Sequence, residues 1–315
     1  MYEKNWPLSA GFRKINHRNK PRICVIIRTK PVFQLTTPIR NSTNGVEMIP
    51  YDYHIHTQFS CDSDVSMLQM CQSAIEHGIP EIGISDHLDF HPKDECCNYF
   101  KADAWWQELE RCRGAFEGSL VIRAGIEIGE PHRFFESIDP LLERYPWDYC
   151  LGSLHWVEDL CVFDRNYFDR DAADAYRSYF AELLEMVSLG SFDTLAHLDI
   201  VKRYGHDVYG HYDPYPWETE IRSVLRKCAQ RGIALEVNTG TLRRMVGETS
   251  PQQPLITWFK EEGGRWLTLG SDAHQPEHIG FGLESCVSTI REAGFDALAK
   301  FESRQTLPVL LNELS

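Results

Sequence analysis

Seven short apolar segments that alternate with helical patterns most constrain how this chain of 315 residues can fold. The predicted strands are Tyr51–Thr57, Glu81–His87, Val121–Gly129, Asp148–His155, Thr194–Asp199, Ala234–Thr239 and Leu267–His274. Between them, apolar residues at helical spacing predict helices over Ser66–His77, Asp103–Phe116, Asp171–Leu189, Trp217–Gln230 and Pro254–Glu262. Strands that alternate with helices form a parallel sheet. At this chain length we expect that sheet to close into a barrel rather than stay open, giving a single α/β domain.

Histidine and acidic residues gather at the ends of these predicted strands, or just after them. They are His54, His56, Asp62, His87, Glu127, His155, His197, Asp272 and His274. The C-terminal strand ends of an α/β barrel meet at one rim, where active sites form. A lone histidine at a strand end is more often structural, but six of the 13 histidines fall at these ends. Their joint placement predicts a metal site.

The spacing and the number of these side chains indicate more than one ion. Residues two apart in a strand face the same side, so His54 and His56 point together, as do Asp272 and His274. Imidazole and carboxylate ligands suit zinc, manganese and iron. Nine ligands are too many for one ion. We therefore expect two or three divalent ions that share a bridging carboxylate.

The order of these residues, which also includes Ser85-Asp86-His87, resembles the polymerase-and-histidinol-phosphatase (PHP) superfamily over roughly residues 50–300. The resemblance implies a distorted (β/α)7 TIM-like barrel with a trinuclear metal site. In the family's grouping, one ion would be held by His54, His56, Glu127 and Asp272, which form the catalytic metal-hydroxide site. Glu127 would bridge to a second ion on His155 and His197, and Asp62, His87 and His274 would hold the third. The family often has histidine where this chain has Asp62.

The resemblance also implies a hydrolase of phosphoric monoesters, in which a hydroxide held between metal ions attacks phosphorus. The stretches around His197, Asn238 and Asp272 are similar to the histidinol-phosphatase branch. We therefore expect hydrolysis of L-histidinol phosphate to L-histidinol and phosphate, a step of histidine biosynthesis. Three PHP-type or related alternatives stay open: a phosphoesterase acting on nucleotides or another small phosphate ester, an amidohydrolase, and a non-catalytic module.

Positive charge for the phosphate has to come from loops at the same rim. Arg243 is the first candidate, followed by Arg244 and Arg203, because a guanidinium binds phosphate in a bidentate way. Lys202 and Arg133 are further candidates. Carboxylates such as Glu130 or Asp199 could meet the ammonium of the substrate, and Asp86 is expected to orient a metal ligand from behind.

The formal net charge of −14 argues against a nucleic-acid partner, which requires clustered lysine and arginine. No apolar stretch approaches the length of a membrane span, and the ten scattered cysteines are expected to be reduced in a cytoplasmic protein. Residues 1–47 are basic, and their apolar residues follow neither helical nor strand periodicity. They are either a flexible leader or untranslated sequence joined to a true start at Met48, so we place the barrel domain at residues 48–315.

Overall fold

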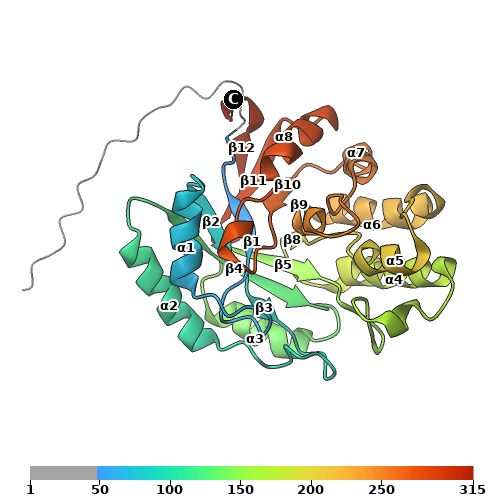
Figure 1. Cartoon of the computed structure of the whole chain (residues 1–315), viewed down its shortest axis with the longest axis horizontal. Coiled ribbons are helices and arrows are strands. Elements are labelled where there is room, and N and C mark those ends of the chain that lie inside the picture. The colour runs from blue at the N-terminus through green and yellow to red at the C-terminus, as the bar shows by residue number, and fades with distance from the viewer. Residues whose placement is uncertain (1–47, 315) are drawn as a thin grey trace, which may run out of the picture. The chain divides into compact units, whose positions relative to one another are not determined.

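The computed structural model describes residues 48–314, and the expectations for residues 1–47 lie outside these described residues. A parallel sheet forms the centre of this part of the chain, with helices around it (Figure 1). The order of its strands is β1 (Asp52–Ile55), β2 (Glu81–Ile84), β4 (Val121–Gly129), β5 (Tyr149–Ser153), β8 (Thr194–Leu195), β9 (Ala234–Asn238) and β10 (Leu267–Gly270).

The two outer strands of this order meet and close the sheet into a barrel. Ile55, at the end of β1, forms a parallel bridge with Ala273, just beyond β10. The backbone N–H of His56 donates to the carbonyl of Ala273 at 2.9 Å, and that of Ala273 donates to the carbonyl of His54 at 3.2 Å. The predicted seven-stranded barrel is therefore confirmed. It is distorted, because β8 has only two residues and the short β3 (His87–Leu88) pairs beside β4.

The helices of the barrel lie on its outside. They are α1 (Met67–Glu76), α2 (Ala102–Ala115), α3 (Phe135–Arg144), α4 (Ala172–Leu189), α5 (Lys202–Tyr209), α6 (Glu218–Arg231), α7 (Gln253–Glu261) and α8 (Leu283–Glu292). α1 begins where predicted because Ser66 and Gln69 cap each other's backbone N–H groups. The sequence pattern did not predict α3, α5, α8 or the hairpin of β11 (Ala297–Glu302) and β12 (Gln305–Leu310). None of the helices in residues 48–314 has both the length and the apolar character to cross a membrane.

Three tyrosines fill the barrel interior below the rim. The rings of Tyr51 and Tyr53 stack with centroids 4.1 Å apart, and those of Tyr53 and Tyr149 stack at 4.9 Å. All three are buried. Glycine is required beside them, because a Cβ atom on Gly83 or Gly125 would lie within 2.3 Å of the Tyr149 side chain. This aromatic layer closes the interior below the strand ends, so the polar side chains collect at the opposite end.

One expectation about the cysteines is wrong. Cys61 and Cys96 form a disulfide, with their Cα atoms 5.2 Å apart. The sequence gives no sign of this pairing, because the two residues are 35 positions apart and lie on loops that only the barrel brings together. The other cysteines of residues 48–314 are free thiols, as expected.

Candidate metal centre

The carboxylate of Glu127 lies at the centre of the histidine cluster. Glu127 belongs to β4 and is 1% exposed. Its Oε2 atom lies 3.2 Å from His54 Nε2, 3.3 Å from His56 Nε2 and 3.2 Å from His87 Nδ1. One carboxylate oxygen therefore faces three imidazoles, which come from β1, from the residue directly after β1 and from β3.

The other oxygen of Glu127 faces the opposite wall of the barrel. Its Oε1 atom lies 2.8 Å from His197 Nε2 and 3.5 Å from His155 Nε2, and it accepts a hydrogen bond of 2.5 Å from Ser153 Oγ. Five imidazole nitrogens thus lie within 3.5 Å of this carboxylate. Such a carboxylate has the position needed to bridge two cations.

The cluster opens to solvent on the side of Asp62, Asp272 and His274. Asp62 Oδ2 lies 2.9 Å from His274 Nε2 and 3.6 Å from His87 Nε2. Asp272 Oδ1 lies 3.5 Å from His56 Nε2. The backbone of Asp272 has φ of 55°, which lies in the left-handed region that few residues adopt. This bend turns the carboxylate from the end of β10 toward the histidines.

All nine predicted side chains come together in this cluster. Four overlapping groups have potential ligand atoms within 4.8 Å of one another: His56, Asp62, His87 and His274; His54, His56 and Asp272; His54, Glu127 and His197; and His87, Asp89 and His155. These groups differ from the expected ones in several ways. His56 also belongs to the outer group, and Glu127 groups with His54 and His197 rather than with His155. His155 groups instead with His87 and Asp89.

Asp89 was missed by the sequence analysis. Its Oδ2 atom lies 3.4 Å from His87 Nδ1 and its Oδ1 atom lies 3.7 Å from His155 Nδ1. The pattern His87-x-Asp89 has the same two-residue spacing as His54-x-His56, and this spacing could have revealed it.

The charge balance of the cluster shows how closely its groups depend on one another. Burial alone would raise the pKa of Glu127, but the imidazoles of His54 and His87 hold that pKa well below its usual range. Burial, together with His274 and His87, lowers the pKa of His56 to about 3. Burial also lowers the pKa of His87, but Glu127 and Asp62 outweigh it and raise the value to about 10. The low pKa of Glu127 and the raised pKa of His87 therefore depend on each other.

Several buried atoms of the cluster have no hydrogen-bond partner in residues 48–314. They are His54 Nε2, His56 Nε2, His87 Nδ1, Asp89 Oδ1 and Glu127 Oε2. Buried polar atoms are nearly always paired, because leaving one unpaired costs about 1–3 kcal/mol. Atoms of this kind that converge on one space fit divalent cations, and their nitrogen and oxygen donors suit zinc, manganese or iron.

Glu236 on β9 orients two of the histidines and was not singled out from the sequence. Its Oε1 atom lies 2.6 Å from His54 Nδ1, while its Oε2 atom accepts from the backbone N–H of His197 at 2.8 Å. The contact with Nδ1 leaves His54 Nε2 directed at Glu127. A carboxylate behind a ligating histidine fixes its ring and raises its basicity.

Asp86 supports His56 in a similar way, as expected. It accepts a hydrogen bond of 2.8 Å from Ser60 Oγ, and that hydroxyl lies 3.0 Å from His56 Nδ1. Asp86 also accepts from the indole of Trp105 at 2.8 Å. The carboxylate therefore acts on the cluster through Ser60.

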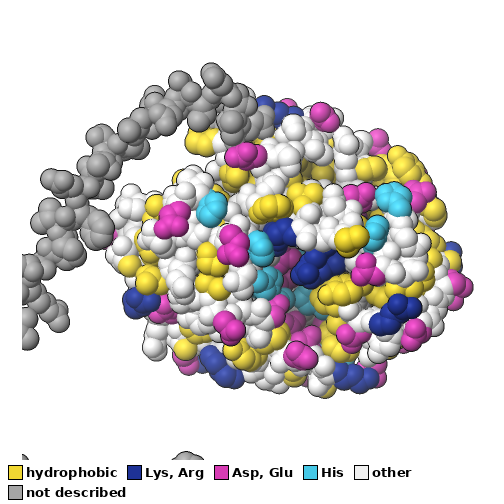
Figure 2. All heavy atoms as spheres, viewed as in Figure 1, with side chains coloured by type: hydrophobic (Ala, Val, Ile, Leu, Met, Phe, Trp, Pro, Cys, Tyr) yellow, Lys and Arg dark blue, Asp and Glu magenta, His cyan; other side chains and the backbone are white. Residues whose placement is uncertain are grey.

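A cavity of about 410 Å³ adjoins the open side of the cluster. It is lined by Asp62, Arg203, Gly240, Arg243, Arg244, Asp272, His274 and His278. In Figure 2 the displayed face is hollowed near its centre, and histidine, acidic and basic side chains gather in and around the hollow. Positive charge therefore lies beside the candidate metal ligands despite the negative net charge.

The three predicted arginines differ in whether their guanidinium groups are already hydrogen-bonded within the protein. Arg243 donates from its two terminal nitrogens to the carbonyls of Ser271 and Asp272, both at 2.8 Å, so it holds the backbone that carries Asp272. The side chains of Arg203 and Arg244 have no hydrogen bond or ion pair with any residue from 48 to 314. Arg203 and Arg244 are thus the guanidinium groups available to an anion.

Other predicted substrate contacts are wrong. Lys202 is fully buried and pairs with Asp199, so neither reaches a ligand. Glu130 is also fully buried and accepts from the backbone N–H groups of His155 and Trp156. The sequence places Lys202, Asp199 and Glu130 next to strand ends but does not show that their side chains turn into the protein. Arg133 pairs with Glu182 at 2.6 Å and remains partly exposed, so its predicted contact with phosphate stays a prediction.

Comparison with known proteins agrees with this geometry. A family model described as the PHP domain matches residues 52–240. The chain belongs to the PHP family. A histidinol-phosphatase of Lactococcus lactis is 30% identical over 258 residues, which are 79% of this chain and 93% of the relative. A probable histidinol-phosphatase of Deinococcus radiodurans is 30% identical over 250 residues, covering 77% of this chain and 93% of the relative.

Two solved structures give the same fold. The crystal structure of histidinol phosphate phosphatase from Lactococcus lactis, complexed with zinc, L-histidinol and phosphate, superposes with a TM-score of 0.75 at 27% identity. The match covers 82% of this chain and 98% of the other. A hisK protein from Listeria monocytogenes, at 20% identity and a TM-score of 0.63, supports the fold alone.

Proposed function

We propose that this PHP-family protein is a metal-dependent phosphomonoesterase that hydrolyses L-histidinol phosphate to L-histidinol and phosphate, a step of histidine biosynthesis. The observation that carries the proposal is the buried Glu127 carboxylate, which has five imidazole nitrogens within 3.5 Å and lies beside a cavity lined in part by the unpaired Arg203 and Arg244. The substrate is taken from the relatives, which carry the name histidinol-phosphatase and cover most of this chain.

The proposed centre has two to three divalent ions of zinc, manganese or iron. One ion would be held by His54, His56, Glu127 and Asp272, a second by Glu127, His155 and His197, and a third by Asp62, His87 and His274. The distances of these side chains to Glu127 or to Asp62 support this assignment. Bound ions would acidify a water molecule for attack on phosphorus and would offset the charge of the phosphate oxygens.

The residues of this chain prepare the site in three ways. Glu236 and Asp86 fix the rings of His54 and His56, directly and through Ser60. Arg243 holds the carbonyls at the end of β10 and so keeps Asp272 directed at the cluster. Arg203 and Arg244 would bind the phosphate oxygens, because a guanidinium forms two parallel hydrogen bonds to such a group.

Metal analysis of the purified protein, together with phosphate release from L-histidinol phosphate, tests the proposal. We expect at least two bound divalent ions per chain and activity that a chelator removes and a divalent ion restores. A nucleotide 3′,5′-bisphosphate serves as the competing substrate. If it is turned over at least about a hundred times more efficiently, a difference of about 3 kcal/mol in transition-state binding, the proposed substrate is wrong. Activity untouched by chelation would overturn the metal mechanism.

A further inference from the structure

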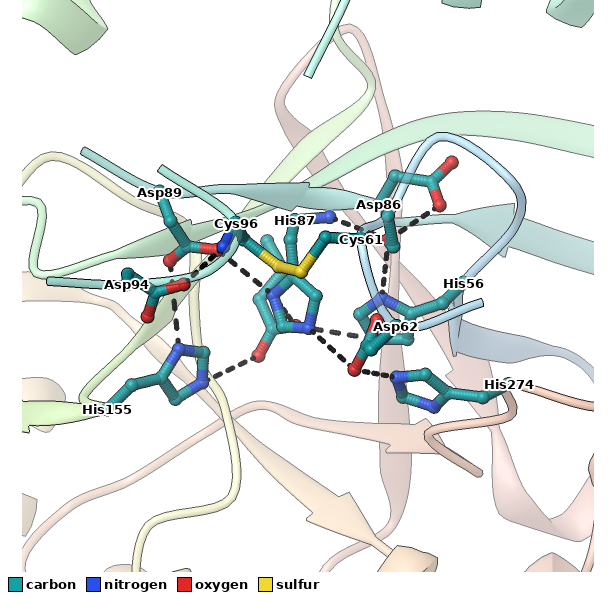
Figure 3. The surroundings of a disulfide bond; sticks show 12 residues. His56, Cys61, Asp62, Asp86, His87, Asp89, Asp94, Cys96, His155 and His274 are labelled. Carbon is teal, nitrogen blue, oxygen red and sulfur yellow. Dashed lines mark hydrogen bonds and ion pairs between the residues drawn. A yellow bond between two sulfur atoms is a disulfide. The ribbon is translucent and has the colours of Figure 1, made fainter. Parts of the chain in front are cut away.

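The Cys61–Cys96 disulfide joins two loops at the rim of the candidate metal centre. Cys61 lies on the loop that follows β1, directly before Asp62, and Cys96 lies on the loop that follows β3. Figure 3 shows the disulfide above His87, with Asp89 and Asp94 on one side and Asp62 on the other. It is a covalent link between the loop of a candidate ligand and the neighbouring part of the rim.

The Asp62 side chain has little else to hold it. It is 48% exposed, and its partners are the two imidazoles of His87 and His274. The neighbours Ser60 and Ser63 are tied to other parts of the rim, through Asp86 and through the carbonyl of His274. Asp62 lies between these two points, next to the disulfide. Its place therefore depends on the turn that contains Cys61.

The loop of Cys96, in contrast, is firmly anchored. Cys96 is 7% exposed, and its backbone N–H donates to Asp94 Oδ1 at 2.7 Å. The other oxygen of Asp94 accepts from the indole of Trp156 at 2.6 Å. The backbone N–H of Asn98 donates to the carbonyl of Asp89 at 3.0 Å. The disulfide thus ties the turn that carries the exposed Asp62 side chain to a rigid support.

We propose that the Cys61–Cys96 disulfide is a positioning element that fixes Asp62 as a ligand of the outermost metal ion, and that its reduction by a dithiol selectively weakens the binding of that ion. This inference rests on the proposed metal centre. Holding a ligand in its binding geometry before the ion arrives removes an ordering cost from binding. Asp62 is the candidate ligand that is most exposed to solvent, so it has the most freedom to lose.

The reduction has a definite course. Cys61 is partly exposed and Cys96 is buried, so the thiolate of a small dithiol attacks the sulfur of Cys61 and displaces Cys96 as a thiolate, which takes up a proton from solvent. The second thiolate of the reductant then attacks the other sulfur of the same reductant molecule, which is bonded to Cys61 in the mixed disulfide. This step releases Cys61 as a thiolate, which is protonated in turn. The protein gains two electrons and two protons, and the dithiol becomes a cyclic disulfide.

Metal titration of three variants tests the proposal independently of any substrate. Wild type, Cys61→Ser, Cys96→Ser and the double variant are titrated with zinc against a competing chelator, and their thermal unfolding is measured in parallel. Cys97→Ser is the matched control, because this free thiol lies next to Cys96 and leaves the disulfide intact. We expect the Kd of the weakest-bound ion to rise at least about tenfold in both single variants, with no further rise in the double variant and no change in Cys97→Ser.

Reduction of the disulfide with dithiothreitol is the second part of the experiment. Reduction of the wild type, followed by anaerobic removal of the dithiothreitol because this dithiol also chelates zinc, should reproduce the affinity of the double variant, while the same treatment should leave the double variant unchanged. Bridging the reduced thiols with a one-carbon linker, in the Cys97→Ser background, should restore tight binding that dithiothreitol no longer removes. If all ions keep their Kd in the cysteine variants while only the melting temperature falls, the disulfide contributes to stability alone and the proposal is wrong. If the protein binds ions as expected but does not hydrolyse L-histidinol phosphate, the proposed function fails and this inference stands.

Discussion

Two buried polar clusters lie on the C-terminal side of the same barrel, and they differ in how completely their atoms are paired. In the first, Lys202 Nζ donates to Asp199 Oδ2 at 2.8 Å and to the carbonyl of Thr249 at 2.6 Å, while Ser250 Oγ donates to the other oxygen of Asp199. In the second, around Glu127, several buried nitrogen and oxygen atoms have no hydrogen-bond partner within residues 48–314.

This difference in hydrogen bonding distinguishes a structural cluster from a candidate functional site. Lys202 and Asp199 follow a strand end, just as the candidate metal ligands do, and both are charged and fully buried. Because they pair with each other and with residues 249 and 250, neither side chain is available to a ligand. Their role is to join the start of α5 to the loop that follows β9. The Glu127 cluster has donor atoms left over, and only a bound ligand can satisfy them. Single buried atoms without a partner also occur elsewhere in residues 48–314, so what marks the site is the convergence of several such atoms on one space.

The largest effect is expected for Glu127→Gln, which removes the shared negative charge. Bound metal should fall, and turnover should drop about a thousandfold or more, because metal-assisted hydrolysis depends on several kcal/mol of charge stabilisation. Metal analysis and steady-state kinetics measure both. The exposed Glu110→Gln serves as a control with the same chemical change. Full activity in Glu127→Gln would show that the carboxylate does not bridge the ions.

Lys202→Met should affect the other cluster and spare the first. Removal of one partner of a buried ion pair leaves an uncompensated charge, so the free energy of unfolding should fall by about 3–5 kcal/mol. Denaturant titration measures the loss. Addition of Asp199→Asn should recover part of it, since the unpaired charge is then gone. The metal content of the folded protein should not change. A loss of metal would show that the Lys202–Asp199 pair supports metal binding and that the two clusters are coupled.

Glu236→Gln tests the layer behind the metal ligands. The substitution keeps the shape of the side chain but weakens its contact with His54 Nδ1, so we expect metal affinity to fall about 10- to 100-fold. Competition with a chelator measures the change. Glu81→Gln is a useful comparison, because Glu81 is also a buried carboxylate on a barrel strand but pairs with Arg123 away from the cluster. Equal losses in both variants would mean that Glu236 acts only on stability.

The smallest effect is expected for Arg244→Ala. An unpaired guanidinium that binds phosphate in both ground state and transition state should raise KM about tenfold and leave kcat and metal content nearly unchanged. Initial-rate kinetics give this split. Arg226→Ala, on the exposed surface of α6 and paired with Glu262, is the matched control. A fall in kcat without a change in KM would instead assign Arg244 to the transition state alone.

The sequence predicted the barrel and the nine clustered side chains well, because both follow from local patterns. Strand periodicity located each strand, although β2, β8 and β10 end three or four residues before the predicted ends at His87, Asp199 and His274. The rim of a parallel barrel still brings the residues after these strands together. The roles of supporting residues depend on side-chain direction across the barrel, which no local pattern carries. Arg243 turns to the carbonyls of β10, Lys202 turns into the protein, and Glu236 reaches across to β1. The Cys61–Cys96 pair depends on two loops that meet only after folding.

The stacked tyrosines occupy the barrel interior below the rim, while the arginine-lined cavity lies on the open side of the cluster. In the proposed enzyme, a phosphate ester bound in that cavity would therefore cover the metal ions on their solvent side. Exchange of the metal ions with solvent would then be slower while substrate or phosphate is bound than in the free enzyme.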